Sequence, residues 1–397
     1  MSNSRMSPLG GLVCAAIALA VVGAFAVSAA AATAGTAASH VTCGQMITTD
    51  TKLGNDLVNC PSNGIVIGAD DVTLDLNGHV IDGDGTEFTA CPPDEPCDMG
   101  VVDLDHHGVT IKGGTIREFG FGALVVGASD SRITRLVLSN NLRAGLLVVG
   151  SSHSEIDGVT ASANGLTTNA SGVAIFDSDE LTITRNAAFD NGDIGFFIVG
   201  LENSLVANNS ISGNLEPEAA IILEGSGNEL SGNRVSGNHD GIIVLGDANT
   251  ITGNLLSGTG CPGECGFGVS LEGGSGNVIN GNTIAGFHRA GISVRSFEEF
   301  GGPPTVGTTV RGNLIRDSVD GVLVDSTAVD TLVERNIAIG AGDDGIDVDG
   351  AATTLTGNLA VRNGDLGIEA VPGVTDGGGN KAHANGNPAQ CTNVSCS

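Results

Sequence analysis

The sequence contains neither tryptophan nor tyrosine, and it is poor in positive charge. It has 16 Lys and Arg against 45 Asp and Glu, so the formal net charge is −29. Nucleic acid binding depends on basic residues, so this balance excludes a nucleic acid partner. Anionic polysaccharides or membranes would be repelled unless a divalent cation bridged the charges. The missing Trp and Tyr also remove the side chains whose broad faces suit sugar stacking.

The chain also lacks any segment with a long helical period, and its apolar residues are mostly small or β-branched. Glycine is abundant, with 62 of 397 residues, while the hydrophobic fraction is an ordinary 41%. That fraction is too high for a disordered chain. The composition therefore favours a β-rich protein with many tight turns.

The N-terminus is typical of an export signal. Arg5 precedes an uncharged apolar run over residues 9–27, and small residues follow over 28–38. This pattern predicts a signal peptide over residues 1–38, cleaved between 30 and 38. No basic cluster follows the apolar run, so no membrane span is expected after cleavage. We therefore predict a secreted, extracellular protein.

Eight cysteines follow the predicted signal peptide, and they fall into four neighbouring pairs. In an exported protein such pairs predict local disulfides, although spacing alone does not prove the connectivity. A metal site built from the two central pairs is the alternative, but their spacing does not match a zinc motif. The predicted bonds are Cys43–Cys60, Cys91–Cys97, Cys261–Cys265 and Cys391–Cys396.

One motif, a glycine followed by alternating aliphatic residues, returns every 21 to 30 residues. Two earlier copies begin at Gly64 and Gly100, and the second of these looks shifted by one residue. Alternation places the residues one and three after each glycine inward, as at Val269 and Leu271 or at Ile346 and Val348. The repeats begin at Gly122, Gly145, Gly172, Gly195, Ala220, Gly241, Gly268, Gly291, Gly321, Gly345 and Gly367.

Asparagine forms a second column between these anchors. It usually follows Gly, Arg or Asn and precedes a short apolar strand. Asn tolerates the left-handed backbone region, and its amide can bond the copy in the next repeat, so we expect a stacked Asn column at one corner. The column comprises Asn186, Asn209, Asn233, Asn254, Asn282, Asn313, Asn336 and Asn358.

Repeats of two or three short strands cannot bury an apolar face alone, but stacked coils can. The pattern predicts an all-β parallel β-helix of about 12–13 coils. A leucine-rich repeat would need dominant Leu, and a calcium-binding nonapeptide repeat would need a nine-residue period that is absent. We predict an N-terminal cap over 39–63 with Cys43 and Cys60, the β-helix over 64–372, and a tail over 373–397 with Cys391 and Cys396.

The chain resembles the right-handed parallel β-helix proteins grouped with pectate lyases, polygalacturonases and mannuronan epimerases, and more closely the exported β-helix repeat proteins of actinobacteria. The resemblance covers residues 64–372 and extends into the tail. It is carried by the segment 71–82, by the Gly-Ile-x-Val and Gly-Asn columns, and by the tail from Gly377 to Cys396. It implies a right-handed pectin lyase-like fold. Members of this superfamily differ in activity, so the resemblance leaves the function open.

Acidic residues cluster in the last repeats. Asp343, Asp344 and Asp347 are our candidate catalytic residues, because outward carboxylates on adjacent strands lie about 5 Å apart, a distance suited to glycoside hydrolysis. Asp320 lies one repeat earlier and Glu369 one repeat later. Asp343-Asp344 resembles the paired Asp of polygalacturonases, but the flanking Asn-Thr-Asp, Gly-His-Gly and Arg-Ile-Lys motifs are absent.

The same region has two other interpretations. Calcium prefers hard oxygen ligands, so Asp325, Asp347 and Asp349 are candidate calcium ligands. A lyase would instead need a basic residue, for which His288, Arg289 and Arg295 are the secondary candidates.

A separate stripe of Leu124, Leu147, Phe197, Ile222 and Ile243 falls at predicted outward positions. Such a stripe would be an interaction surface unless another segment covers it.

Two hypotheses for function follow: a secreted protein that binds or acts on extracellular polysaccharide, or a non-enzymatic surface rod that presents loops to a partner. The first predicts titratable groups with shifted pKa gathered on one sheet face, whereas the second predicts evenly spread charge.

Overall fold

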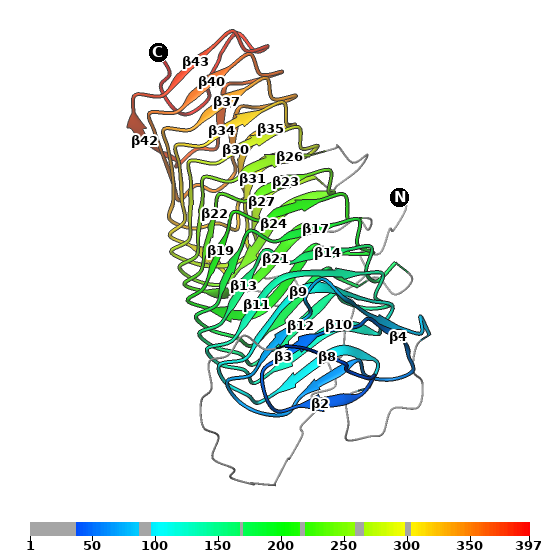
Figure 1. Ribbon diagram of the computed structural model, residues 1–397. Helices are drawn as coiled ribbons and strands as arrows, with labels where there is room; N and C mark the ends of the chain where they lie inside the picture. The colour runs from blue at the N-terminus through cyan, green and yellow to red at the C-terminus, as the bar shows by residue number, and fades with distance from the viewer. Residues whose placement is uncertain (1–36, 87–96, 167–169, 215–218, 259–265, 298–302) are drawn as a thin grey trace, which may run out of the picture.

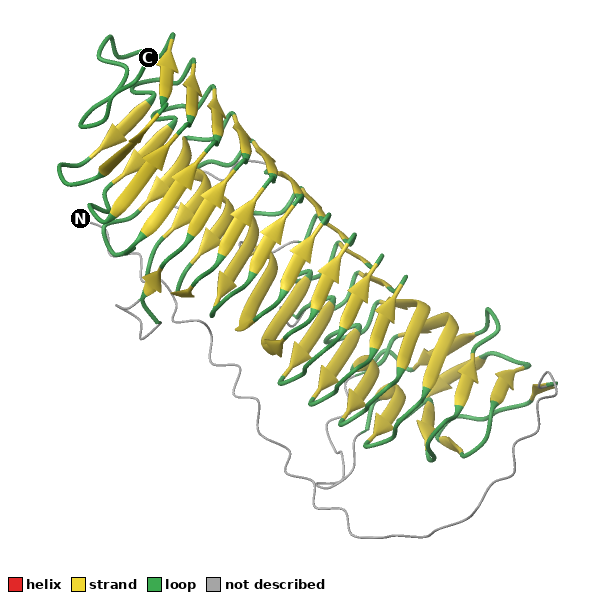
Figure 2. Cartoon of the chain, turned by 90° about the vertical axis from the view of Figure 1, so that its left-hand side faces the viewer, coloured by secondary structure: helices red, strands yellow, loops and turns green. Residues whose placement is uncertain are grey.

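A computed structural model describes residues 37–86, 97–166, 170–214, 219–258, 266–297 and 303–397. The regular structure of these residues is entirely β, and the chain winds into an elongated stack of short parallel strands (Figures 1 and 2). Among the described residues there is thus no helix of the length and hydropathy needed to cross a bilayer. The predicted signal peptide lies almost wholly outside the described range and stays a prediction.

Sheet 1, as we call the 14-stranded parallel sheet, contains the glycine-anchored strands. Its strands are β2 (Gln45–Ile47), β5 (Ile65–Ile67), β8 (Met99–Leu104), β10 (Phe121–Val126), β12 (Leu146–Val149), β15 (Val173–Phe176), β18 (Phe196–Glu202), β21 (Ala219–Ser226), β24 (Asp240–Leu245), β27 (Phe267–Leu271), β31 (Ala290–Val294), β35 (Asp320–Val324), β38 (Ile346–Val348) and β41 (Ile368–Ala370). This order gives about 13 coils and confirms the predicted all-β, parallel solenoid.

Sheet 2, the 27-stranded parallel sheet, has two rows of strands that share the long strands β9 (Thr110–Arg117) and β11 (Arg132–Ser139). The first row also contains β1 (Ala38–Ser39), β3 (Thr51–Leu53), β6 (Thr73–Asp75), β13 (Glu155–Asp157), β16 (Thr182–Thr184), β19 (Leu205–Ala207), β22 (Glu229–Ser231), β25 (Thr250–Thr252), β29 (Val278–Asn280), β33 (Thr309–Arg311), β36 (Thr331–Glu334), β39 (Thr353–Thr356) and β42 (Thr375–Gly378).

The second row contains β4 (Leu57–Cys60), β7 (Val80–Gly83), β14 (Thr160–Ser162), β17 (Ala187–Phe189), β20 (Ser210–Ser212), β23 (Arg234–Ser236), β26 (Leu255–Ser257), β30 (Thr283–Ala285), β34 (Leu314–Arg316), β37 (Ile337–Ile339), β40 (Leu359–Val361) and β43 (Lys381–His383). A separate pair, β28 (Gly274–Ser275) and β32 (Thr305–Val306), lies beside the stack. Most coils therefore pass once through sheet 1 and twice through sheet 2.

The core lies between the two sheets and is filled by the inward residues that alternation predicted. Val269, Leu271, Ile346 and Val348 are all fully buried. The anchor glycine is needed because neighbouring coils come very close at this point. A Cβ on Gly321 would lie 2.2 Å from the carbonyl oxygen of Gly345, so any side chain would displace backbone.

The Asn column is confirmed as a hydrogen-bonded ladder inside the turn between the two rows of sheet 2. The Asn254 side-chain amide, for example, donates to the Asn282 carbonyl oxygen at 3.0 Å, and Asn254 itself accepts from Asn233. The ladder extends beyond Asn358 to Asn380. The prediction that these Asn residues adopt the left-handed backbone conformation was wrong, because the residue before each Asn, such as Gly253, has the positive φ. The Asn itself is buried to bond its neighbours.

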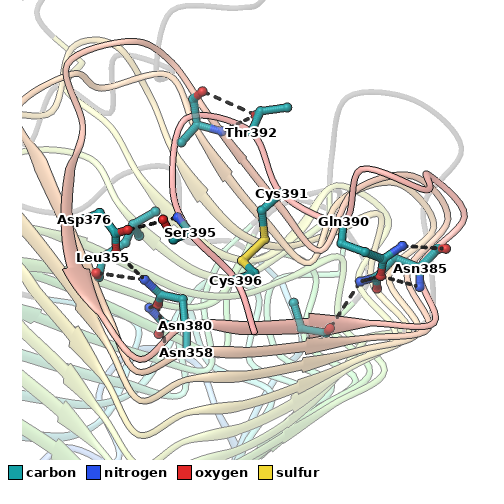
Figure 3. The surroundings of a disulfide bond; sticks show 12 residues. Leu355, Asn358, Asp376, Asn380, Asn385, Gln390, Cys391, Thr392, Ser395 and Cys396 are labelled. Atoms are coloured by element: carbon teal, nitrogen blue, oxygen red, sulfur yellow. Dashed lines mark hydrogen bonds between the residues drawn. A yellow bond between two sulfur atoms is a disulfide. The ribbon is translucent and has the colours of Figure 1, made fainter.

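A second ladder lies at the turn leading to sheet 1. It runs through Asn141, Asn164, Asn191, Asn214 and Asn238, each side-chain amide donating to the next side-chain oxygen at 2.9–3.0 Å. At the C-terminal end, Gln390 accepts a 2.9 Å hydrogen bond from Asn385 (Figure 3). Gln390 thus ends a shorter ladder that begins at Asn363. The tail thereby satisfies an amide that no further coil can bond.

The apparent shift of the repeat at Gly100 was wrong, because Val101 pairs with Ala123 and Val102 with Leu124 in the ordinary register. Asp103 therefore occupies an inward position, opposite Val125, and is only 1% exposed. One of its oxygens bonds the His106 ring at 2.9 Å, and the other has no partner. Burial raises the pKa of Asp103.

The two ends of the solenoid are closed by disulfides that match the predicted pairs. Cys43 bonds Cys60, and Cys391 bonds Cys396 (Figure 3). Cys97 is also in a disulfide, while its predicted partner Cys91 and the pair Cys261–Cys265 lie outside the described residues. Strands β1 to β4 lie largely within the segment expected to be a cap, and β42 and β43 lie within the expected tail, so parallel pairing reaches both segments.

Candidate functional site

The outer face of sheet 1 presents its side chains in three rows, because each coil keeps the same register. Row 1 is the residue before the anchor glycine, row 2 is two residues after it, and row 3 is four residues after it. In the coil of Gly345 these positions hold Asp344, Asp347 and Asp349. Register places Asp347 between Leu323 and Glu369, its row-2 neighbours.

Acidic side chains gather where rows 1 and 2 reach the C-terminal coils. We call the set Asp320, Asp343, Asp344, Asp347 and Glu369 the acidic cluster. Carboxylate oxygens of Asp320, Asp343 and Asp344 lie within 4.8 Å of one another, and so do those of Asp344, Asp347 and Glu369. The cluster therefore brings together the three candidate catalytic residues, and Asp344 is common to both groups.

Asp344 is held by the coils on either side of it. Its backbone N–H donates to the Asp320 carboxylate at 3.3 Å, and its own carboxylate accepts from the Leu366 N–H at 2.7 Å. Its side chain also shares a hydrogen bond with Glu369. Asp344 is only 4% exposed, whereas Asp343 and Glu369 are exposed. A substrate would thus meet one buried carboxyl between solvent-facing ones.

Burial and the repulsion of neighbouring carboxylates disfavour ionisation of Asp320, Asp344 and Asp347. Burial first, and then the neighbouring Glu369 and Asp343, raise the pKa of Asp344 to about 8. Burial together with Asp349 and Asp320 raises the pKa of Asp347 to about 7. The pKa of Asp320 rises to about 6, again mainly by burial, with Arg289 opposing the rise. At neutral pH the group contains both protonated and ionised carboxyls, which acid–base catalysis requires.

The secondary basic candidates lie on the neighbouring coils but do not enter the cluster. Arg289 and Arg295 both stack on the ring of Phe267, with guanidinium carbons 5.2 and 4.7 Å from its centre. Arg295 also pairs with Glu272. His288 is exposed and lines a shallow depression of about 420 Å³ beside Phe287, at the turn that precedes row 1.

Arg295 separates the acidic cluster from the rest of the face. It is a row-3 residue and Phe267 is a row-1 residue, so the guanidinium must cross row 2 to reach the ring. Beneath this crossing, Ser270 and Ser293 are fully buried although they point outward. The Ser293 hydroxyl and the Arg295 Nε have no hydrogen-bond partner. We call this feature the Arg295 bridge.

The structure only partly gathers the candidate calcium ligands. Asp347 belongs to the acidic cluster, whereas Asp325 and Asp349 lie in row 3 and belong to neither group of close carboxylates among the described residues. Asp325 instead accepts hydrogen bonds from the backbone and hydroxyl of Thr327. A divalent cation on this face would find its oxygen ligands around Asp344.

Sequence reasoning did not select Asp320 or Glu369 as site residues, although both belong to the cluster. A signal for Asp320 was present, because Asp320 precedes Gly321 just as Asp344 precedes Gly345. Matching positions across repeats would therefore have placed these two carboxylates side by side. Glu369 holds the row-2 position after Gly367 that Asp347 holds after Gly345.

The solved structures that resemble this chain share little sequence with it. The tailspike protein of E. coli bacteriophage HK620, in complex with a pentasaccharide, superposes with a TM-score of 0.55 at 12% identity, covering 89% of this chain and 73% of the tailspike. DFA-IIIase from Arthrobacter chlorophenolicus A6, in complex with GF2, gives 0.47 at 15% identity over 74% and 71%. PfbA, a surface adhesin of Streptococcus pneumoniae, gives 0.47 at 10% identity over 83% of each chain.

No curated protein matches the sequence. The sequence does match the family described as "Right handed beta helix region", over residues 46–211, 99–256 and 202–386. Together these overlapping matches span nearly the whole described solenoid. The right-handedness implied by the resemblance is therefore confirmed, and the chain belongs to the right-handed β-helix family.

Proposed function

We propose that this chain is a secreted hydrolase that cleaves glycosidic bonds in a neutral extracellular polysaccharide at the acidic cluster. One observation carries the proposal: Asp344, with a pKa of about 8, lies within 4.8 Å of both Asp320 and Asp347 on a sheet face. Glycoside hydrolysis needs such a pair, with one carboxyl protonated and the other ionised.

Asp344 is the proton donor and Asp320 its ionised partner in this mechanism. Asp344 has the highest of the three raised pKa values and gives its proton to the leaving oxygen, while the Asp320 carboxylate attacks the anomeric carbon. Water then attacks the glycosyl–Asp320 ester and gives its proton to Asp344. Carboxyl oxygens this close fit the double displacement, which uses groups about 5 Å apart, better than the wider inverting arrangement.

The charge of the face selects the substrate. In rows 1 and 2, the strands β35, β38 and β41 present Asp320, Asp344, Asp347 and Glu369 without a basic residue. Arg295, two coils away from Asp347, is already paired with Glu272, and the single charge of Arg289, which lowers the pKa of Asp320, is outnumbered by these acids. A uronate polymer would therefore be repelled, whereas a neutral sugar can hydrogen-bond to carboxyls in either protonation state.

Further observations support secretion and polysaccharide binding. A tailspike with the same fold was solved in complex with a pentasaccharide, so this architecture can present a sugar-binding surface. The terminal disulfides and the predicted signal peptide support export, as does the resemblance to exported actinobacterial repeat proteins. Secretion and polysaccharide binding are both part of the proposal.

The test is release of reducing ends from a panel of neutral and uronate polysaccharides, with calcium or with a chelator. We expect turnover on a neutral polymer, a loss of at least about 100-fold for Asp344→Asn, and unchanged activity for Asp330→Asn. Asp330 is an exposed acid in a turn of another part of the coil, with a left-handed backbone that Asn tolerates. Product anomers analysed by NMR should retain the substrate configuration.

If Asp344→Asn left turnover unchanged, the acidic cluster would not be the catalytic site. Absorbance of unsaturated products would point to a lyase. Absence of turnover on every polymer would favour the non-enzymatic rod. A calcium-dependent activity on uronates would favour the second candidate function, in which the same carboxylates bind calcium and the ion bridges an acidic sugar. The two overlapping groups of three carboxylates within 4.8 Å are the observation that favours this alternative.

A further inference from the structure

The outer face of sheet 1 has a second region, on the N-terminal side of the Arg295 bridge. In rows 2 and 3 of the five strands β8, β10, β12, β15 and β18, every side chain is apolar. We call these rows the apolar track. Its half-buried members include Val126, Leu147, Val149, Phe176, Phe197 and Val199. These side chains project from the solenoid rather than into its core.

Two phenylalanine rings of the apolar track pack against each other. Phe176 and Phe197 form an edge-to-face pair with ring centres 5.7 Å apart. Phe197 and Ile243 also pack on Ile194, Ala219 and Ile222, which form an apolar cluster separate from the main core. Phe197 is therefore supported at the surface by this cluster and by the Phe176 ring.

We propose that the apolar track is a second carbohydrate-binding surface, which holds a neutral polysaccharide chain at a distance from the cleavage site; this inference rests on the proposed function. Rings and branched aliphatic side chains contact the apolar C–H faces of sugars, and the absence of charge in both rows suits a neutral polymer. With neither Trp nor Tyr in the chain, phenylalanine is the one aromatic side chain with a broad face available for stacking.

The dimensions of the track favour a narrow ligand over a protein partner. Five strands spaced about 4.8 Å apart give a length of about 19 Å, and two outward rows give a width of about 13 Å. The resulting area of about 250 Å² is well below the roughly 800 Å² per partner that a stable protein interface buries. A single polysaccharide chain laid along the solenoid needs only such a strip.

The track and the acidic cluster lie on one line along the solenoid axis. From β18 to β38 there are six strand steps, or about 29 Å, with the Arg295 bridge between the two regions. Only a polymer can contact both regions at once. The track should consequently affect the binding of long chains and leave the hydrolysis of short oligosaccharides unchanged, because these reach the acidic cluster alone.

The test is migration in native gels containing hydroxyethylcellulose, xyloglucan, arabinoxylan or laminarin. The test variant is Phe176→Ser with Phe197→Ser, and the matched control is Phe189→Ser, an exposed phenylalanine on β17 of sheet 2. A second variant, Phe176→Leu with Phe197→Leu, keeps the side chains apolar but removes the rings. It is used to test the inference if the serine variant is unstable. We expect at least one polymer to retard the wild type, about tenfold weaker retardation for the track variants, and no change for the control.

Retention of full affinity by the track variants, or no retardation of the wild type by any polymer, would overturn the inference. Sedimentation of a wild-type dimer that the track variants abolish would also overturn it, because the occupant would then be a second copy of the chain. The wild type separates the two proposals, and the Asp344→Asn, Asp347→Asn protein should be retarded like the wild type. Retardation of the wild type without hydrolysis removes the hydrolase and leaves the track, whereas hydrolysis by the wild type without retardation does the reverse.

Discussion

Strands β8–β18 and strands β27–β41 belong to the same sheet and bury the same kind of residues, yet their outward rows differ in chemistry. Ile198 in the first region and Ile346 in the second both point inward and are fully buried. In row 2, Phe197 in the first region is matched by Asp347 in the second. The inward rows thus set the fold, and the outward rows are free to carry either an apolar track or an acidic cluster.

The Arg295 bridge lies at the boundary between these chemistries. A carboxyl group beside an apolar patch loses water without gaining a partner, so the two surfaces are best kept apart. Arg295 provides one charge paired with Glu272 on one side and stacked on Phe267 on the other. A side chain with both a guanidinium and an apolar stem suits such a border.

The largest expected effect tests whether the inward rows are equivalent in the two regions. Ile198→Ala and Ile346→Ala each remove a fully buried side chain and leave a cavity, so each should lower the free energy of unfolding by about 2–4 kcal/mol. Urea unfolding followed by circular dichroism measures both. Similar losses of stability would support equally tight packing of the inward rows in the two regions. A much smaller loss for Ile346→Ala would mean that the acidic region is already loosely packed.

The next expected effect concerns pH and should arise from the acidic region. Asp320, Asp344 and Asp347 have folded pKa values of about 6, 8 and 7, above their ordinary value of 3.8. Between pH 4 and 8 the folded protein therefore holds more protons than the unfolded chain. Since the slope of stability with pH follows that difference, their contribution is complete below about pH 4 and is lost as pH rises toward 8.

Replacing two of these groups should flatten that slope. Asp344→Asn with Asp347→Asn should raise the Tm by a few degrees at pH 8 and change it little at pH 4, because asparagine does not ionise. Thermal unfolding from pH 4 to 8 without divalent cations measures this, with Asp330→Asn as the control. A wild-type Tm that is highest at pH 8 under these conditions would contradict the raised pKa values. Calcium that stabilises the wild type and not the variant would support the cation-binding alternative.

The sequence predicted those features that recur in every coil. The spacing of Gly321, Gly345 and the other anchors predicted sheet 1, and the Asn column predicted a ladder that is hydrogen bonded throughout. The stripe through Leu147 and Phe197 was also predicted to face outward, as its register confirms. Repetition makes such predictions reliable because the same kind of residue recurs at the same position in many coils.

Features that occur once were harder to predict, because burial and electrostatics depend on the coils above and below. The carboxylates of Asp320 and Asp344 are 24 residues apart, and only their shared register brings them together. The Arg295 bridge depends on three side chains from two coils, Arg295, Phe267 and Glu272. Asp103 misled the alternation argument, because an aspartate among valines suggests an outward position.

Asp103 gives the smallest expected effect and a test of how strictly the inward rows are apolar. Its neighbours in that row are Ile67 and Val125, so Asp103→Val would restore a continuous apolar row. Replacing a buried acid with a hydrophobic residue of similar volume is often neutral or stabilising. We expect a gain of about 1 kcal/mol in the free energy of unfolding at pH 7. Because the pKa of Asp103 is raised, the gain should be larger at pH 8 than at pH 4.

The matched variant Asp103→Asn separates the charge from the hydrogen bond. Asparagine keeps the shape and an oxygen for the His106 ring, whose side chain is 21% exposed and reaches water when left alone. If charge burial is the main cost, both variants should stabilise the protein at pH 8, valine more than asparagine. Destabilisation by valine alone would instead show that the Asp103–His106 hydrogen bond stabilises the turn after β8. The inward row would then carry one polar contact of structural value within the region that bears the apolar track.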